Sequence, residues 1–295
     1  MIGFTESFVS DIRKGFSVLN ETRYPWLIDI KSIDWKGVLC FGMGGSAAGG
    51  DFLARIADAS GSIPFVVHRD YQLPTWWTKD WLILATSHSG NTEETFAATE
   101  TALKHGATVV VIATGGALAG LCELYENCHL IPSIAGQPPR TAFGHLFSRQ
   151  LALIECLGFV PGQQPHLREE MLNRLEKAIH ANDFRTPQGT PLLDLAMSLR
   201  ERPVSLLGPT ELEPVLVRFK NQLNENAGRF ARIGVVPEMN HNELVAWGGV
   251  SDDADPERSN QATLFITWEG MHRRVLRRID WMIEHTPTDY AWRIQ

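Results

Sequence analysis

Long apolar runs are missing from this 295-residue sequence. The longest, Trp81–Ala85 and Val109–Ala113, are far shorter than the roughly 20 residues that cross a bilayer as a helix. The acidic residues Glu6 and Asp11 do not fit a secretory signal, which is basic at its start and then apolar. We therefore expect a cytoplasmic protein without a membrane partner.

Positive charge is also in short supply. The chain has 27 Lys and Arg against 34 Asp and Glu, which gives a formal net charge of −7 and an isoelectric point near 5.8. Such a protein repels a polyanion unless a local basic patch outweighs the overall field. We therefore expect no nucleic-acid partner.

Cysteine is rare as well. The four cysteines are Cys40, Cys122, Cys128 and Cys156, and none belongs to a CxxC pair or has a histidine at metal-ligand spacing. A thiol inside an apolar segment is usually a small core residue. We expect reduced, structural thiols and no metal site.

The composition that remains is that of a globular protein, with 44% hydrophobic and 21% charged residues. From residue 37 onward, short apolar or β-branched runs alternate with longer amphipathic stretches. This alternation is typical of parallel sheets covered by helices on both faces. The predicted strands are 37–41, 63–67, 81–85, 108–113, 129–131, 204–207, 233–236 and 262–267.

The predicted fold is two three-layer α/β/α domains with parallel sheets, because a chain of this length holds two domains of roughly 150 residues each. The first domain is expected at residues 1–160 and a helical linker region at 161–190. A smaller second domain follows at 191–295. Its long helices are predicted at 213–231 and 272–284.

A glycine-rich turn, Gly42-Met-Gly-Gly-Ser46, follows the first predicted strand and opens a helix. Glycine lets backbone amides approach an anion closely, and the positive end of the helix dipole adds to the attraction. Gly42, Gly44 and Ala47 also satisfy the dinucleotide pattern G-x-G-x-x-[GA]. The turn alone leaves three interpretations open: a phosphate site, a dinucleotide site, or a tight turn that packs a helix on a sheet.

Hydroxyl groups gather in a second loop after the third predicted strand. Ser87, Ser89 and Thr92 lie within six residues at the start of another helix. Capping a helix needs only one such hydroxyl, whereas a phosphate monoester can be held by several hydroxyls together with backbone amides. With Ser46 from the first loop, these residues favour a compact phosphate ester over a dinucleotide.

Two polar motifs in the second half contain candidate catalysts. Glu225 lies on a predicted helix, where an i, i+4 ion pair with Arg229 is the ordinary alternative to catalysis. His241 follows a predicted strand within Asn-His-Asn-Glu, and a lone histidine is more often structural than catalytic. Taken alone, the residues favour the structural interpretation for both.

The two loops resemble the sugar isomerase (SIS) domain, a flavodoxin-like fold that binds phosphosugars. The resemblance rests on Gly-Gly-Ser-x-x-x-Gly-Asp and Ser-x-Ser-Gly-Asn-Thr-Glu-Glu-Thr and covers residues 37–157. It implies two SIS-like domains. The residues implied to hold the phosphate are Gly45, Ser46, Ser87, Ser89 and Thr92.

The second half is similar to the bifunctional phosphoglucose/phosphomannose isomerases, which are built from two SIS domains. The motifs Lys-x-Gln-x-Asn-Glu-Asn-Ala and Glu-x-Asn-His-Asn-Glu carry this resemblance, together with Pro138-Pro139-Arg140, and it extends over residues 37–247. It implies that Glu225 is the base, that His241 opens the sugar ring and that Arg140 lies near the reacting oxygens. It also implies a homodimer in which the histidine comes from the other subunit.

The implied reaction interconverts glucose 6-phosphate, and in addition mannose 6-phosphate, with fructose 6-phosphate by ring opening and an enediolate, without a metal or redox cofactor. The family also uses a lysine near its C-terminus, whereas the last lysine here is Lys220. Thr286 and Thr288 are the candidates for the threonine that admits mannose epimers. Two alternatives stay open: a non-catalytic phosphosugar-binding sensor or regulator, and an isomerase of another phosphosugar.

Overall fold

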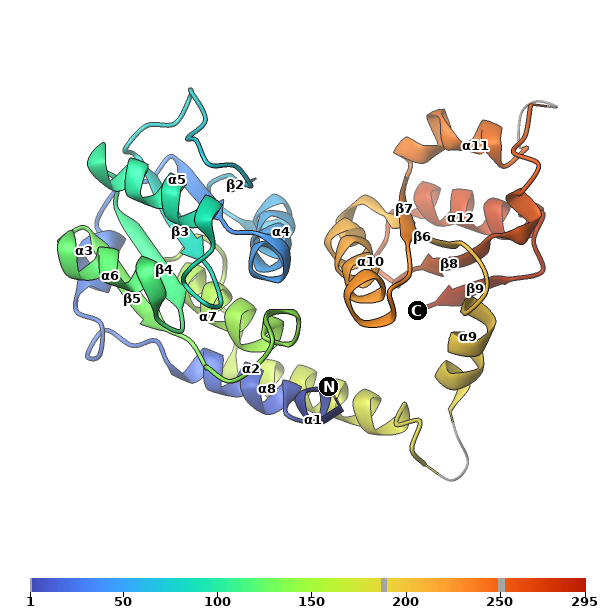
Figure 1. Cartoon of the computed structure of the whole chain (residues 1–295), viewed down its shortest axis with the longest axis horizontal. Coiled ribbons are helices and arrows are strands. Elements are labelled where there is room, and N and C mark those ends of the chain that lie inside the picture. The colour runs from blue at the N-terminus through green and yellow to red at the C-terminus, as the bar shows by residue number, and fades with distance from the viewer. Residues whose placement is uncertain (1, 187–189, 249–252) are drawn as a thin grey trace. The chain divides into compact units, whose positions relative to one another are not determined.

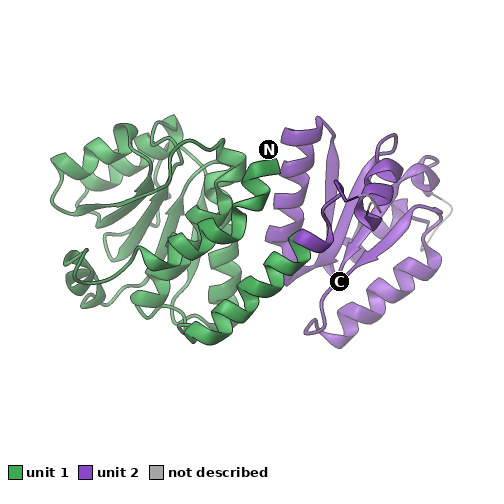
Figure 2. Ribbon diagram, turned by 90° about the horizontal axis from the view of Figure 1, so that it is seen from below, with its two compact units in different colours: residues 1–179 green, residues 180–295 purple. Residues whose placement is uncertain are grey.

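The computed structural model describes residues 2–186, 190–248 and 253–295, which form two compact units (Figure 1). Unit 1 runs to Ile179 and unit 2 begins at His180 (Figure 2). Among the described residues, no helix has the length and apolar character needed to cross a membrane.

Unit 1 is built on a five-stranded sheet with the strand order β2-β1-β3-β4-β5, and every neighbouring pair is parallel. This is the flavodoxin-like order of a doubly wound sheet. The strands are β1 (Gly37–Phe41), β2 (Phe65–His68), β3 (Trp81–Thr86), β4 (Val109–Ala113) and β5 (Cys128–Pro132). The helices are α1 (Ile2–Glu6), α2 (Phe8–Ser17), α3 (Trp26–Lys31), α4 (Gly44–Ser60), α5 (Glu93–Lys104), α6 (Gly116–Leu124), α7 (Phe143–Cys156) and α8 (Pro165–Ala181).

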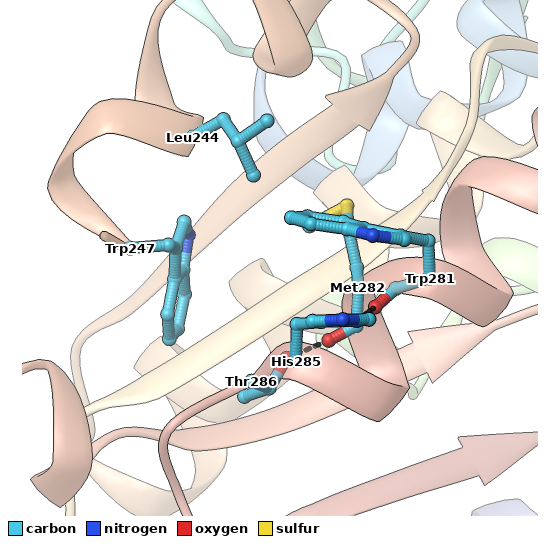
Figure 3. A pocket seen from close by; sticks show the side chains of 6 residues that line it. All are labelled: Leu244, Trp247, Trp281, Met282, His285 and Thr286. Atoms are coloured by element: carbon cyan, nitrogen blue, oxygen red, sulfur yellow. Dashed lines mark hydrogen bonds between the residues drawn. The ribbon is translucent and has the colours of Figure 1, made fainter. Parts of the chain in front are cut away.

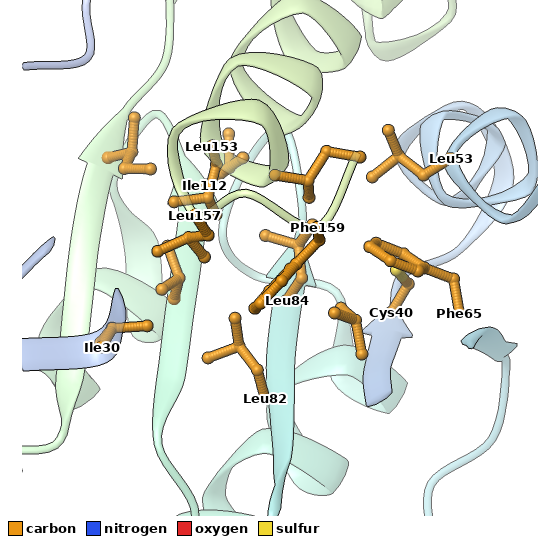
Figure 4. Close-up of a cluster of buried hydrophobic side chains, with 14 of the residues drawn as sticks. Ile30, Cys40, Leu53, Phe65, Leu82, Leu84, Ile112, Leu153, Leu157 and Phe159 are labelled. Atoms are coloured by element: carbon orange, nitrogen blue, oxygen red, sulfur yellow. The ribbon is translucent and has the colours of Figure 1, made fainter. Parts of the chain in front are cut away.

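Both faces of this sheet are buried, which explains why its strands are apolar throughout. Leu82 and Leu84 of β3 point into one core, which Figure 4 shows with Leu53 of α4 and Leu153 of α7. The next residue along the strand from each leucine faces the other way, and Ile83 packs with side chains of α5 and α6. The alternation of two apolar faces therefore fixes the layers of unit 1.

Helix α8 belongs to unit 1 through an ion-paired contact with α2. The guanidinium of Arg13 lies 2.8 Å from Glu169 and 3.3 Å from Glu176. Both carboxylates are partly exposed, so water screens these pairs and they contribute little to the stability of the docking. The stretch that we expected to form a linker region thus begins with a helix attached to unit 1.

Unit 2 repeats the same topology with one strand fewer, because its sheet has the order β7-β6-β8-β9 and is parallel throughout. Its strands are β6 (Val204–Pro209), β7 (Ala231–Val236), β8 (Ala262–Ile266) and β9 (Ala291–Ile294). Its helices are α9 (Pro191–Leu199), α10 (Glu213–Ala227), α11 (Glu243–Ala246) and α12 (Arg273–His285). Leu206 faces α10, and its neighbour Leu207 faces α12.

The predicted fold class is confirmed, since both units are parallel α/β structures with helices on both faces. The prediction of a helix over 213–231 is wrong at its end. Gly228 takes a left-handed conformation with φ of 59° and stops α10 at Ala227, and β7 begins at Ala231. Strand β9 and helix α9 were not predicted at all.

Candidate functional site

The two loops singled out in unit 1 follow β1 and β3, where the strand order of the sheet reverses. β2 follows β1 on one side, and β3, β4 and β5 extend the sheet on the other side. In an open parallel sheet, ligands bind outside the carboxyl ends of the strands at this switch point. The loops after β1 and β3 therefore meet at the position where this fold binds ligands.

Helix α4 begins directly in the first loop. Gly44, its first residue, has φ of +50°, and no side chain caps this helix end. The first amides of a helix have no carbonyl partner within the helix, so they attract an anion. A Cβ on Gly45 would lie 3.1 Å from the carbonyl oxygen of Pro139, a tight contact, so the Arg140 segment approaches this glycine closely.

In the second loop, the hydroxyls contact each other rather than cap the helix. Ser87 Oγ lies 2.8 Å from Thr92 Oγ1 and accepts a hydrogen bond from the amide of Gly90 at 3.1 Å. Thr92 occupies the N-cap position of α5, but its side chain makes no capping bond. Ser87 is buried and Ser89 is exposed, where its Oγ accepts from the amide of Asn91. Simple capping does not explain this cluster of hydroxyls.

His88 joins three segments, a role that its position in the sequence does not predict. Its backbone amide donates to Ser46 Oγ at 3.1 Å, which links the second loop to the first turn of α4. Its ring Nε2 lies 2.8 Å from the carbonyl oxygen of Gln137. Gln137 directly precedes Pro138-Pro139-Arg140, so a buried imidazole connects both loops to the arginine segment.

His88 is next to a group of buried polar side chains. Gln137 Nε2 donates to the buried carboxylate of Asp11 at 2.8 Å. The rings of His88 and His145 are 5.7 Å apart, and His145 lies 2.8 Å from Ser133 Oγ through Nδ1. Burial, followed by the charge of Arg149, lowers the pKa of His145 to about 4. His145 is therefore a neutral ring at physiological pH, and its Nε2 has no hydrogen-bond partner in the described structure.

Arg140 lies in a short 3₁₀ turn, Pro139–Thr141, that follows β5. Its side chain is half-buried. The contact of Gly45 with Pro139 holds this turn against the start of α4. The structure thus gathers Gly45, Ser46, Ser87, Thr92 and Arg140 at one edge of unit 1, and Ser89 lies at the solvent side of the same loop.

Glu225 lies near the end of α10 in unit 2, with an exposed side chain. The expected ion pair with Arg229 is not formed within the described structure, because Arg229 donates to the carbonyl of Arg202 at 2.9 Å instead. Arg218, two helical turns before Glu225, lies on the same face. Burial lowers the pKa of Arg218 to about 10, although the charge of Glu225 acts to raise it. The positively charged Arg218 therefore lies on the same helix face as the candidate base Glu225.

His241 ends a 3₁₀ turn, Glu238–His241, which follows β7, and its ring is exposed. The buried side chain of Met239 anchors this turn in the core. Of the two neighbouring glutamates, Glu243 is ion-paired with Arg232. Glu238 accepts a hydrogen bond from Asn242 at 3.3 Å.

The threonines that we considered for epimer recognition both donate to backbone carbonyls. Thr286 donates to Met282 at the end of α12, and Thr288 donates to Gln261 at 2.8 Å. Thr286 also lines a cavity of about 20 Å³, room for a single water and not for a sugar. Figure 3 shows the six residues that line this cavity: Leu244, Trp247, Trp281, Met282, His285 and Thr286.

Comparison with known proteins connects both units to phosphosugar enzymes. Residues 190–289 match the family described as bacterial phospho-glucose isomerase C-terminal SIS domain. The chain is 33% identical over 222 residues to the bifunctional phosphoglucose/phosphomannose isomerase of Caldicellulosiruptor bescii, a match that covers 74% of this chain and 64% of that protein. The chain thus spans slightly less than two thirds of that relative.

One further relative and one structural neighbour extend the comparison. The D-glucosamine-6-phosphate 4-epimerase of Sulfolobus acidocaldarius is 28% identical over 208 residues, which cover 69% of this chain and 61% of that protein. The C-terminal domain of glucosamine-fructose-6-phosphate aminotransferase from Francisella tularensis is a structural neighbour with a TM-score of 0.72. It is 10% identical, and the match covers 99% of this chain and 87% of that chain, which is evidence for the fold alone.

Proposed function

We propose that the chain, which is similar to the bifunctional phosphoglucose/phosphomannose isomerase family of SIS-domain proteins, interconverts glucose 6-phosphate and fructose 6-phosphate, with mannose 6-phosphate as a further substrate. A cytoplasmic location and a homodimer are parts of this proposal. The observation that carries it is the hydrogen bond from the amide of His88 to Ser46, because it joins both hydroxyl-bearing loops at the switch point of unit 1.

Phosphate binding is assigned to this pair of loops. The hydroxyls of Ser46, Ser87, Ser89 and Thr92 supply donors, and so do the first amides of α4 and α5. The positive ends of both helix dipoles favour a dianion there. The number of donors fits a compact phosphate monoester, which presents several acceptor oxygens at once.

Proton transfer is assigned to Glu225. After ring opening of the aldose, its carboxylate removes the proton from C2, and the electrons of the C–H bond form the C1–C2 double bond of an enediolate. The same group then returns a proton to C1, so that the carbonyl moves to C2. Such acid–base catalysis contributes about 10²–10⁴-fold.

Charge and ring opening are assigned to two further groups. Arg140 stabilises the negative charge that develops on oxygen in the enediolate, which is commonly a large term in catalysis. His241 transfers the proton between the ring oxygen and the C1 hydroxyl when the ring opens. Both roles need a side chain that reaches the bound sugar.

A coupled assay with each hexose 6-phosphate tests the proposal. We expect turnover of glucose 6-phosphate in the wild type, and a loss of at least about 10²-fold in kcat in Glu225→Gln, with phosphosugar binding retained. Glu213→Gln, on the first turn of the same helix, serves as the matched control and should stay active.

The relatives also define what other outcomes would mean. One relative is named a 4-epimerase of an amino sugar phosphate, so turnover of another phosphosugar alone would favour that class of reaction. Binding of hexose 6-phosphates without any turnover would favour a sensor or regulator.

A further inference from the structure

Two of the four cysteines are in contact in unit 1, away from the loops described above. Cys122 lies near the end of α6, and Cys128 is the first residue of β5. Their sulfur atoms are 3.0 Å apart, and all four cysteines are in the thiol form. The five residues between them form a turn closed by two hydrogen bonds, from the amide of Tyr125 to Leu121 and from that of Cys128 to Tyr125.

The two sulfurs differ in reactivity. Cys122 is partly exposed, and its hydrogen bond with Cys128 lowers the pKa of the Cys122 thiol. Cys128 is buried, and the same hydrogen bond raises the pKa of its thiol, with burial acting in the same direction. The more accessible sulfur, that of Cys122, is thus the better nucleophile. The buried sulfur of Cys128 lies beside it, in the position of a resolving thiol.

The other two cysteines lack this arrangement. Cys40 is buried in the sheet, where burial raises the pKa of its thiol to about 12. Burial also raises the pKa of Cys156. Within the described part of the chain, no third His, Cys, Asp or Glu joins Cys122 and Cys128 in a group that could hold a metal ion. The chemistry available to the pair is therefore that of a dithiol.

We propose that Cys122 and Cys128 form a redox modification site, at which a hydroperoxide converts the two thiols into an intramolecular disulfide. This proposal is independent of the sugar chemistry assigned to the protein. It adds a site that the isomerase reaction does not use.

The steps balance with hydrogen peroxide as the oxidant. The Cys122 thiolate attacks one peroxide oxygen, the O–O bond breaks, and hydroxide leaves, which gives a sulfenic acid. Cys128 sulfur then attacks Cys122 sulfur, the S–O bond breaks, and the hydroxyl leaves as water with the Cys128 proton. Two electrons pass from the two sulfurs to the peroxide, and two waters form in total.

The geometry needs only a small adjustment. A disulfide requires the sulfurs to approach by a further distance of about 1 Å from their present separation. Cys122 is next to the end of α6, where Tyr125 already leaves the helical conformation. Rotation of the Cys122 side chain at this helix end can therefore close the gap without moving β5.

The sequence offers a direct way to detect the product. No Lys or Arg lies between His105 and Gln137, so trypsin places both cysteines on the peptide 105–140 and puts Cys40 and Cys156 on separate peptides. Glu123 and Glu126 lie between Cys122 and Cys128, so a glutamyl protease separates the two cysteines unless a disulfide joins them.

The experiment treats the whole protein with hydrogen peroxide, unfolds it, blocks the remaining thiols with an alkylating reagent and maps the peptides by mass spectrometry. We expect peptide 105–140 to lose two hydrogens, to escape alkylation and to remain joined after glutamyl cleavage. The peptides with Cys40 and Cys156 should be alkylated at the same peroxide dose. Dithiothreitol should restore alkylation of the pair.

Single variants separate the two roles. Cys128→Ser should leave a sulfenic acid on Cys122 that dimedone traps, whereas Cys122→Ser should leave Cys128 unoxidised; Cys156→Ser is the control and should still form the bond. The proposal is overturned if both cysteines of peptide 105–140 are alkylated after peroxide treatment of the wild type. It is equally overturned if they oxidise no faster than Cys156.

Discussion

Glu225 and His241 lie at opposite ends of strand β7. Glu225 is close to the end of α10, after which β7 begins, and His241 ends the turn that follows β7. The strand has six residues and therefore spans about 20 Å. Within one copy of unit 2, this arrangement argues against both candidate catalysts acting on the same sugar carbons, and it supports the proposal of a site shared between two copies of the chain.

This separation predicts that two inactive variants complement each other. A heterodimer of Glu225→Gln with His241→Asn contains one site with both substitutions and one site with none, so activity should return on co-expression. The measurement is isomerase activity of the purified heterodimer. In the reciprocal control, wild type paired with the double variant should be inactive at both sites. If instead this pair is active and the first heterodimer is inactive, each site is built from one chain.

The paired hydroxyls of Ser87 and Thr92 predict a binding defect in Ser87→Ala. Loss of one hydrogen bond to a charged phosphate costs about 1.5–3 kcal/mol, so KM should rise about ten- to hundredfold. The kcat should change little, because the proposed role of this hydroxyl is to hold the phosphate and not to act on the reacting carbons. Ser60→Ala, at the other end of α4, is the control, and an unchanged KM in Ser87→Ala would remove this residue from the phosphate site.

Gly90 predicts a stability difference between two otherwise similar substitutions. Gly90 and Gly106 both have positive φ, +72° and +82°, so alanine costs about 1–2 kcal/mol at either position. At Gly90, however, a Cβ would lie 1.8 Å from the carbonyl oxygen of Gly115, whereas nothing lies within 4 Å at Gly106. Urea unfolding should show that Gly90→Ala loses about 1–3 kcal/mol more than Gly106→Ala. Equal losses would mean that the loop has room for a side chain.

His145 predicts a loss of stability in mild acid. Its pKa of about 4 in the folded protein lies below the ordinary value of 6.5, so the unfolded chain binds its proton more readily. The contribution of the neutral His145 ring to the free energy of unfolding is therefore fully present above about pH 6.5. It is lost as the pH drops toward 4, and the loss is at most about 3 kcal/mol. The measurement is the free energy of unfolding at several pH values for wild type and His145→Asn. Parallel pH profiles would contradict the assignment.

The sequence predicted those features that depend on local patterns. The strands at 37–41 and 81–85 were recognised because every residue in them is apolar, as a sheet buried on both faces requires. The loops that follow were recognised by their glycines and hydroxyls. Both features can be recognised within a window of about ten residues.

Features that depend on distant partners could not be predicted in this way. His88 occupies the unspecified position of Ser-x-Ser, and its role comes from Gln137, 49 residues away. Strand β9 has only four residues, and it is defined by pairing with β8 and by the packing of Trp292 and Ile294. The Arg229 side chain had an i, i+4 partner in the sequence, but the fold offers it a carbonyl 27 residues away.

In the proposed reaction, this protein moves a proton between C1 and C2 of a hexose 6-phosphate. The most direct test follows glucose 6-phosphate and the wild-type protein in D₂O by nuclear magnetic resonance. We expect fructose 6-phosphate to form and deuterium to enter C2 of glucose 6-phosphate and C1 of fructose 6-phosphate, with neither change in Glu225→Gln. Unchanged glucose 6-phosphate, or a product altered at C4 with protium retained at C2, would contradict the claim.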